Sequence, residues 1–84
     1  MTVLIKSNLY IMTSMIQSVR FDKKNYTKKQ ADSWMKYFKL KETDFFISAH
    51  SIRYYLKDPN EFNRFETEIA GPGILLVVGY YNLY

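Results

Sequence analysis

The sequence contains no cysteine, and only one of its 84 residues is a histidine. The absence of cysteine excludes a disulfide scaffold, a thiolate metal site and a cysteine nucleophile. A metal centre built from several histidines is excluded as well, because His50 stands alone. We therefore expect no metal ion and no other cofactor in this chain.

Glycine and serine are sparse or poorly placed for catalysis. The glycines at residues 70–73, in the segment AGPG, lack the helix-opening lysine of a phosphate-binding loop, so this segment is expected to be a turn. His50 stands near Ser48, Ser51 and Asp44, but neighbours along one strand or loop point to alternating sides and do not converge. No nucleophile elbow surrounds either serine. The chain is accordingly expected not to be an enzyme and to have no small-molecule substrate.

Charge is present, but it is divided unevenly along the chain. Residues 1–57 carry eleven Lys and Arg against four acidic residues, a net +7, whereas residues 58–84 carry one Arg against four acidic residues, a net −3. The overall composition, 48% hydrophobic and 24% charged, is typical of one globular domain. A small protein with opposite charge at its two ends can bind a polyanion, or it can bind another protein, including a second copy of itself.

The N-terminal segment MTVLIKSNLYIMTSMIQ is apolar, but it does not have the pattern of an export signal. No charged region precedes the apolar stretch, which Lys6 interrupts, and no cleavage site follows, so we expect the protein not to be secreted. The segment is also too short and too polar to span a bilayer. We expect residues 1–14 to form an apolar arm or strand and residues 15–84 to form a single domain. A start at Met1, Met12 or Met15 stays open.

Apolar periodicity predicts one helix and four strands. Thr27 followed by Gln30 is a capping-box pattern, and the apolar residues after it recur at helical spacing, at Ala31, Trp34, Met35 and Phe38. We expect Trp34 to be buried between this helix and a sheet. Alternating patterns predict strands near residues 15–21, 51–56 and 64–69, and a continuous apolar run predicts a central strand at 74–81. The order β-α-β-β-β predicts an α+β fold, a mainly antiparallel sheet of about four strands with the helix on one face and a possible extra N-terminal strand.

Two segments, MIQSVRFDKKNYTKKQADSWMKYFKLK and IRYYLKDPNEFNRFETEIAGPGILLVVG, carry a moderately specific pattern. Over residues 16–79 the chain resembles a small domain that recurs in large DNA viruses and phages, through Gln17, Ser18, Val19, Lys23, Tyr26, Thr27, Ala31, Trp34, Arg53, Tyr54, Asp58, Pro59, Phe62, Ile74, Val77 and Gly79. The resemblance implies a viral protein of unassigned role, located in the infected host cell or in the virion. Some phages carry a protease domain after a similar segment. None is attached in these 84 residues, so the resemblance implies no catalytic function.

The apolar arm and the aromatic C-terminal segment are the best candidates for contacts with a partner. One short helix cannot cover both, and exposed apolar arms and aromatic tails are typical of interfaces. We therefore expect self-association as a homodimer or assembly module, with strand addition as the simplest route. The residues expected at the contact are Val3, Ile5, Leu9, Ile11, Tyr80, Tyr81, Leu83 and Tyr84.

The basic residues favour an alternative function, sequence-independent binding of nucleic acid. The lysines around the helix form its solvated face in the simplest interpretation. They can also hold phosphates by charge while nearby tyrosines stack on bases. For Arg53 we favour an ion pair with Glu66 or Glu68 on the next strand over contact with a ligand. The possible nucleic-acid contacts are Lys23, Lys24, Lys28, Lys29, Lys36 and Arg53.

Overall fold

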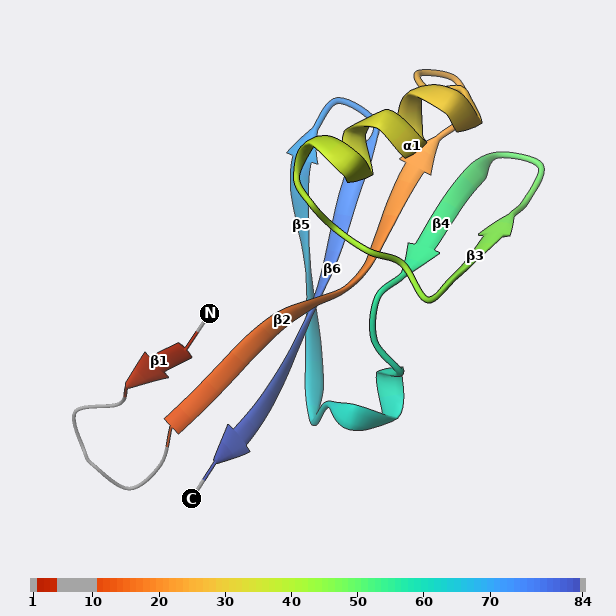
Figure 1. The fold of residues 1–84 in the computed structure, drawn as a ribbon. Helices are drawn as coiled ribbons and strands as arrows, with labels where there is room; N and C mark the ends of the chain where they lie inside the picture. The colour runs from red at the N-terminus through yellow and green to blue at the C-terminus, as the bar shows by residue number, and fades with distance from the viewer. Residues whose placement is uncertain (1, 5–10, 84) are drawn as a thin grey trace.

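The computed structural model describes residues 2–4 and 11–83, with side chains placed from residue 14 to residue 81. In this part of the chain six strands, one α-helix and one 3₁₀ turn follow one another (Figure 1). They are β1 (Thr2–Leu4), β2 (Ile11–Asp22), α1 (Lys28–Tyr37), β3 (Asp44–Ile47), β4 (Ser51–Tyr55), the 3₁₀ turn η1 (Pro59–Glu61), β5 (Arg64–Gly71) and β6 (Ile74–Leu83).

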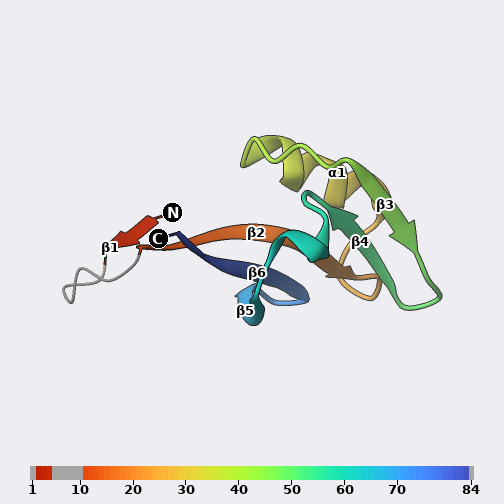
Figure 2. The same ribbon diagram turned by 90° about the horizontal axis from the view of Figure 1, so that it is seen from below.

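All strand pairs are antiparallel and belong to one sheet. The strand order is β3-β4-β2-β6-β5. One edge of β2 pairs with β6, and the other edge pairs with β1 at the beginning of β2 and with β4 at its end. Helix α1 covers one face of this sheet (Figure 2). The predicted α+β fold, with one helix on an antiparallel sheet and an extra N-terminal strand, is confirmed.

Strand β3 is the element that the sequence analysis missed. It has only four residues, all of them exposed, and it pairs with β4 as an edge strand. A strand that is solvated on both sides has no alternation of apolar and polar residues, and that alternation is the signal by which strands are recognised.

Helix α1 begins as predicted and ends in a Schellman motif. Thr27 Oγ1 accepts a hydrogen bond from Gln30 N at 3.2 Å, and Gln30 Oε1 accepts one from Thr27 N at 2.9 Å, so the capping box is confirmed. At the other end, Lys39 has a φ of 57°, and the N–H of Leu40 donates to the carbonyl of Met35 at 2.9 Å. This turn brings Leu40 against the core and leaves Phe38 52% exposed.

The hydrophobic core lies between α1 and the sheet. Alternate residues of the sheet point toward the helix, and Ala31 and Met35 meet them from α1; the buried sheet residues are Val19, Phe21, Ile52, Tyr54 and Ile74. The ring of Phe21 is the centre of this core. It makes edge-to-face contacts with Tyr26 and Trp34, each at 5.4 Å between ring centroids, and with Tyr54 at 5.6 Å. Trp34 is only partly buried, so the expectation of its burial was right only in part.

A β-bulge at Gln17 divides β2 into two halves. The register of β2 against β6 shifts between Ile16 and Ser18. Gln17, the extra residue of the bulge, makes two hydrogen bonds to the segment that follows β4. Its carbonyl accepts a hydrogen bond from Leu56 N at 2.8 Å, and its side-chain amide donates to the carbonyl of Lys57 at 2.9 Å. A bulge increases the twist of a strand and bends it. Beyond the bulge, β2 runs away from the helix.

The part beyond the bulge is a narrow extension, which we call the ribbon: β1, residues 11–15 of β2 and residues 79–83 of β6. It projects from the helix-covered end of the sheet (Figures 1 and 2). The molecule measures 45 × 22 × 20 Å, with a radius of gyration of 14.3 Å. A compact chain of this length would have a radius of gyration of about 12 Å. Strand β2 crosses the domain boundary expected at residue 14 without interruption, since it spans Ile11–Asp22.

A second, smaller aromatic cluster lies where the ribbon joins the sheet. By alternation along β6, Gly79 faces away from the side that carries Ile74 and Leu76. The buried ring of Phe62, which follows η1, packs directly over Gly79 and lies 5.8 Å from Phe65 and 5.6 Å from Tyr81 between ring centroids. This cluster fastens the turn between β4 and β5 to the base of the ribbon.

Candidate interaction surfaces

The expected partner-contact residues converge on the ribbon. Val3 lies in β1, Ile11 in β2, and Tyr80, Tyr81 and Leu83 in β6. Ile11 stands opposite Leu83 in the register, so the two ends of the chain pair with each other in the same sheet. Ile5, Leu9 and Tyr84 were also expected at the contact; they lie outside the described residues.

The ribbon has open edges. Strand β5 pairs with β6 only as far as Tyr80, and β4 pairs with β2 only from Ser18 onward. Among the strands that the structure describes, none therefore pairs with the outer edge of β1 or with the β5-side edge of residues 81–83. Such edges present backbone N–H and C=O groups that can pair with another chain.

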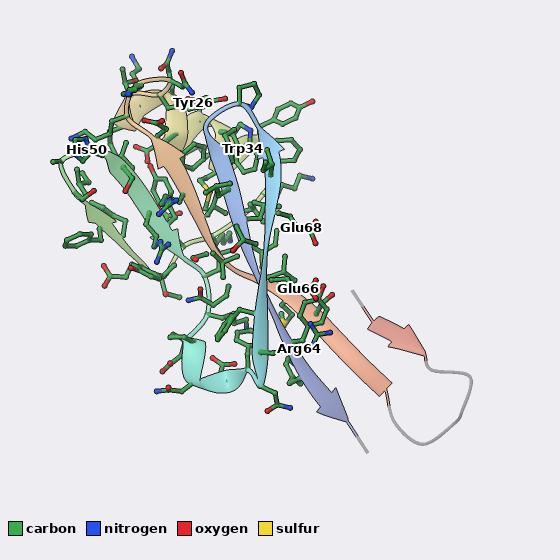
Figure 3. All side chains as sticks on the ribbon, turned by 180° about the vertical axis from the view of Figure 1, so that it is seen from behind. Tyr26, Trp34, His50, Arg64, Glu66 and Glu68 are labelled. Carbon is green, nitrogen blue, oxygen red and sulfur yellow. The ribbon has the colours of Figure 1, made fainter. Side chains whose placement is uncertain are left out.

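The two tyrosines at the base of the ribbon make contacts within the chain. The guanidinium of Arg64 lies 4.2 Å from the ring centroid of Tyr80, whose hydroxyl donates to Glu66 at 3.2 Å. Arg64 and Glu66 form an ion pair at 2.6 Å along β5 (Figure 3). The hydrogen bond from Arg64, and then that from Tyr80, lowers the pKa of Glu66. The hydroxyl of Tyr81 donates to the sulfur of Met15 at 3.6 Å.

The expected nucleic-acid contacts do not form one surface. Lys23 and Lys24 lie in the turn after β2, and Lys28, Lys29 and Lys36 lie on α1. Lys23 donates to the carbonyl of Ser48 at 3.1 Å, and Lys28 pairs with Asp32 at 2.7 Å and lies 4.5 Å from the ring centroid of Phe45. Lys24, Lys29 and Lys36 are exposed. Arg53 lies on the sheet face opposite to the helix, because it alternates with the buried Ile52 and Tyr54.

The predicted ion pair between Arg53 and Glu66 or Glu68 is wrong. Strands β2 and β6 separate β4 from β5, so Arg53 is not next to the acidic strand. Its cross-strand neighbours are Phe46 of β3 and Arg20 of β2. The guanidinium of Arg53 lies 5.9 Å from the ring centroid of Tyr55.

Asp32 joins the helix to the core through two hydrogen bonds. It accepts one from Lys28 and one from the hydroxyl of Tyr54. These bonds, that from Lys28 foremost, lower the pKa of Asp32. Burial first, and then the bond to Asp32, raises the pKa of Tyr54 well above its usual value.

The lowered pKa of Asp32 predicts a loss of stability in acid. Its stabilising effect is fully present above the pKa of an unfolded aspartate, about 3.9, and is lost as the pH falls through the lower pKa of the folded state. Because the carboxylate is 42% exposed, we expect Asp32→Asn to cost no more than about 1 kcal/mol at neutral pH. Urea unfolding followed by circular dichroism between pH 7 and strongly acidic pH would measure this. The difference between parent and Asp32→Asn should shrink in acid. A difference that stays constant over this pH range would contradict the prediction.

His50 lies in the turn between β3 and β4, and its side chain is exposed. The hydroxyl of Ser48 accepts hydrogen bonds from the backbone N–H groups of His50 and Ser51 and exchanges one with the hydroxyl of Ser51 at 3.0 Å. These bonds shape the turn. In the described part of the chain no three His, Cys, Asp or Glu residues gather as metal ligands, and no helix there is long and apolar enough to cross a membrane.

Comparison with protein-family models, curated proteins and solved structures gives no match to this chain. The resemblance to the small viral and phage domain therefore stays a prediction.

Proposed function

We propose that this chain is a non-enzymatic interaction module that associates with a second copy of itself through the ribbon. Its viral type, and its place in the infected cell or the virion, are parts of the proposal that depend on the sequence resemblance. The observation that carries the self-association is the projection of the ribbon beyond the helix-covered sheet (Figure 2).

Three features of the ribbon support this proposal. Phe62 packs against the base of the ribbon, at Gly79 and Tyr81, but α1 does not reach the ribbon. A narrow antiparallel ribbon is marginally stable by itself, and pairing or packing with another chain would stabilise it. Its outer edges have no partner strand among the described residues. Apolar residues pair with one another where the two ends of the chain meet, since Ile11 stands opposite both Leu4 and Leu83 and Met12 stands opposite Val3. An apolar ribbon with open edges is well suited to strand addition between two copies.

Introducing charged side chains into the ribbon is expected to abolish the dimer without unfolding the domain. The double variant Ile11→Lys/Leu83→Asp places an opposite-charge pair at two residues that already face each other, so pairing within the ribbon is retained. The same charges should make insertion into an apolar contact with another copy unfavourable. We expect the parent protein to dimerise with rising concentration in sedimentation velocity, and the variant to remain a monomer with an unchanged circular dichroism spectrum.

The matched control is Tyr37→Lys/Ile69→Asp, which replaces two apolar residues that are 80% and 79% exposed on other parts of the molecule. This variant should dimerise as the parent does. A parent protein that is monomeric at its highest soluble concentration would contradict the proposal. Equal dissociation of both double variants would also contradict it, because association would then depend on exposed apolar area in general.

A second candidate function is binding of nucleic acid without sequence preference. It is supported by exposed basic side chains that have no acidic partner in the described structure, among them Lys24, Lys29 and Lys36. Their wide separation around α1 and the β2 turn predicts weak binding that falls steeply with salt.

A further inference from the structure

The sheet face opposite to α1, which we call the open face, carries a row of residues that crosses five strands. The register places these residues side by side, because each is the cross-strand partner of the next. In the order of the strands they are Phe46, Arg53, Arg20, Leu75 and Ile69. Phe62 covers this face at Gly79, but no α-helix in the described part of the chain lies on this side of the sheet (Figure 3).

Two arginines stand at the centre of this row. Arg20 of β2 and Arg53 of β4 are directly opposite each other, and like charges in that position destabilise a sheet. In the described structure no carboxylate forms an ion pair with either guanidinium. The pair is therefore an uncompensated positive centre, which an anion would stabilise.

A hollow of about 460 Å³ continues from Arg20 toward the turn end of the sheet. It is lined by basic and polar side chains, including Lys24, His50 and Ser51, and its floor is apolar at Leu75. Asp22 is the acidic residue in its lining, and one of its oxygens accepts a hydrogen bond from the backbone N–H of Lys24 at 2.9 Å. The lining sets Arg20 and Lys24 against Asp22, so the hollow keeps a net positive charge beside the arginine pair.

Aromatic rings flank the arginine pair on the same face. Phe46 is 61% exposed beside Arg53, although it belongs to a chain that buries other rings in its core. Tyr55 lies two residues further along β4, in contact with the guanidinium of Arg53. Phe46 is exposed and Tyr55 is half-buried. Accessible rings next to guanidinium groups are the combination that holds unpaired bases by stacking and phosphates by charge.

We infer that the open face binds single-stranded nucleic acid, with Arg20 and Arg53 on the phosphates and Phe46 and Tyr55 against the bases. A single strand fits better than a duplex, because the faces of paired bases are already stacked and cannot reach a flat sheet. A second copy of this chain offers the arginines fewer anionic groups than a phosphate backbone does, since on its acidic strand Glu66 is already paired with Arg64 and Glu68 is the remaining carboxylate. The inference does not depend on the ribbon or on the dimer.

Loss of the arginine pair is expected to weaken the binding of a labelled oligothymidine of about 15 nucleotides by at least tenfold in fluorescence anisotropy. The variant is Arg20→Gln/Arg53→Gln. If each arginine contacts one phosphate, the slope of log affinity against log salt should become shallower by about 1.4. Phe46→Ala should weaken binding by about fivefold or more. A duplex of the same length should bind the parent more weakly than the single strand does.

The matched control is Lys39→Gln/Lys41→Gln, which removes the same charge from exposed positions beyond the C-terminal end of α1 and should change the affinity less than about threefold. Four results would overturn the inference: no binding by the parent, equal weakening by both double variants, a duplex bound as tightly as the single strand, or no effect of Phe46→Ala. Sedimentation velocity of Arg20→Gln/Arg53→Gln tests whether a second copy of the chain occupies the open face instead. If the two substitutions dissociate the dimer that the parent forms but leave the oligonucleotide affinity unchanged, the open face serves self-association and the inference is overturned.

Discussion

Replacing Phe21 with alanine is expected to lower the free energy of unfolding by about 4 kcal/mol, because truncation of a buried phenylalanine removes apolar burial and leaves a cavity. Phe21 is fully buried, and its ring touches three other aromatic rings at once. These neighbours are themselves large and are held by α1, by β4 and by the segment that leads into α1, so they cannot collapse into the space. A domain of this size has a total stability of only about 5–15 kcal/mol, so this loss removes between about a quarter and four fifths of it.

Urea unfolding followed by far-ultraviolet circular dichroism is the appropriate measurement, because Trp34 contacts Phe21 and its fluorescence would change for local reasons. Phe46→Ala provides the control for loss of a phenyl ring. That ring is largely exposed, so its removal should change the stability by less than about 0.5 kcal/mol. A loss below about 1 kcal/mol for Phe21→Ala would show that this ring is not the centre of the core.

Replacing Gly79 with alanine is expected to cost about 2–3 kcal/mol, the upper part of the range for overpacking. A Cβ atom at this position would lie 2.4 Å from the ring of Phe62, so the ring would have to move. The cost arises from space and not from backbone strain, because Gly79 is not among the residues with positive φ. Displacement of Phe62 would also loosen its contacts with Phe65 and Tyr81 at the base of the ribbon.

A double-mutant cycle separates this clash from other effects of the substitution. In a Phe62→Ala background the ring is absent, so Gly79→Ala should then cost less than about 0.5 kcal/mol, a coupling of about 2 kcal/mol between the two sites. Gly71→Ala is the matched control in the parent background. A Cβ at Gly71 would meet only Ile74 Cδ1, at an ordinary 3.8 Å. Equal costs for Gly79→Ala in both backgrounds would contradict the close packing of Phe62.

Several site residues could be found only once the strands were placed. Arg20 appeared in the sequence as one polar position of an alternating strand, and nothing nearby in the chain indicates that it faces Arg53. Phe46 belongs to a strand without alternation, and Phe62 follows a short turn. The pairing of Arg20 with Arg53 and the contact of Phe62 with Gly79 join parts of the chain that are far apart in sequence.

The sequence by itself determined the local structure: the capping box that begins α1, the alternation that buries Ile52 and Tyr54, and the exclusion of cysteine chemistry. These features depend on residues a few positions apart, which meet in any chain that forms the element. The tertiary structure alone decided which strands are neighbours, and therefore that Arg53 faces Arg20 and not Glu66, and that Ile11 meets Leu83. Strand order and register follow from how the whole apolar surface is buried at once, and that is a property of the assembled sheet and helix.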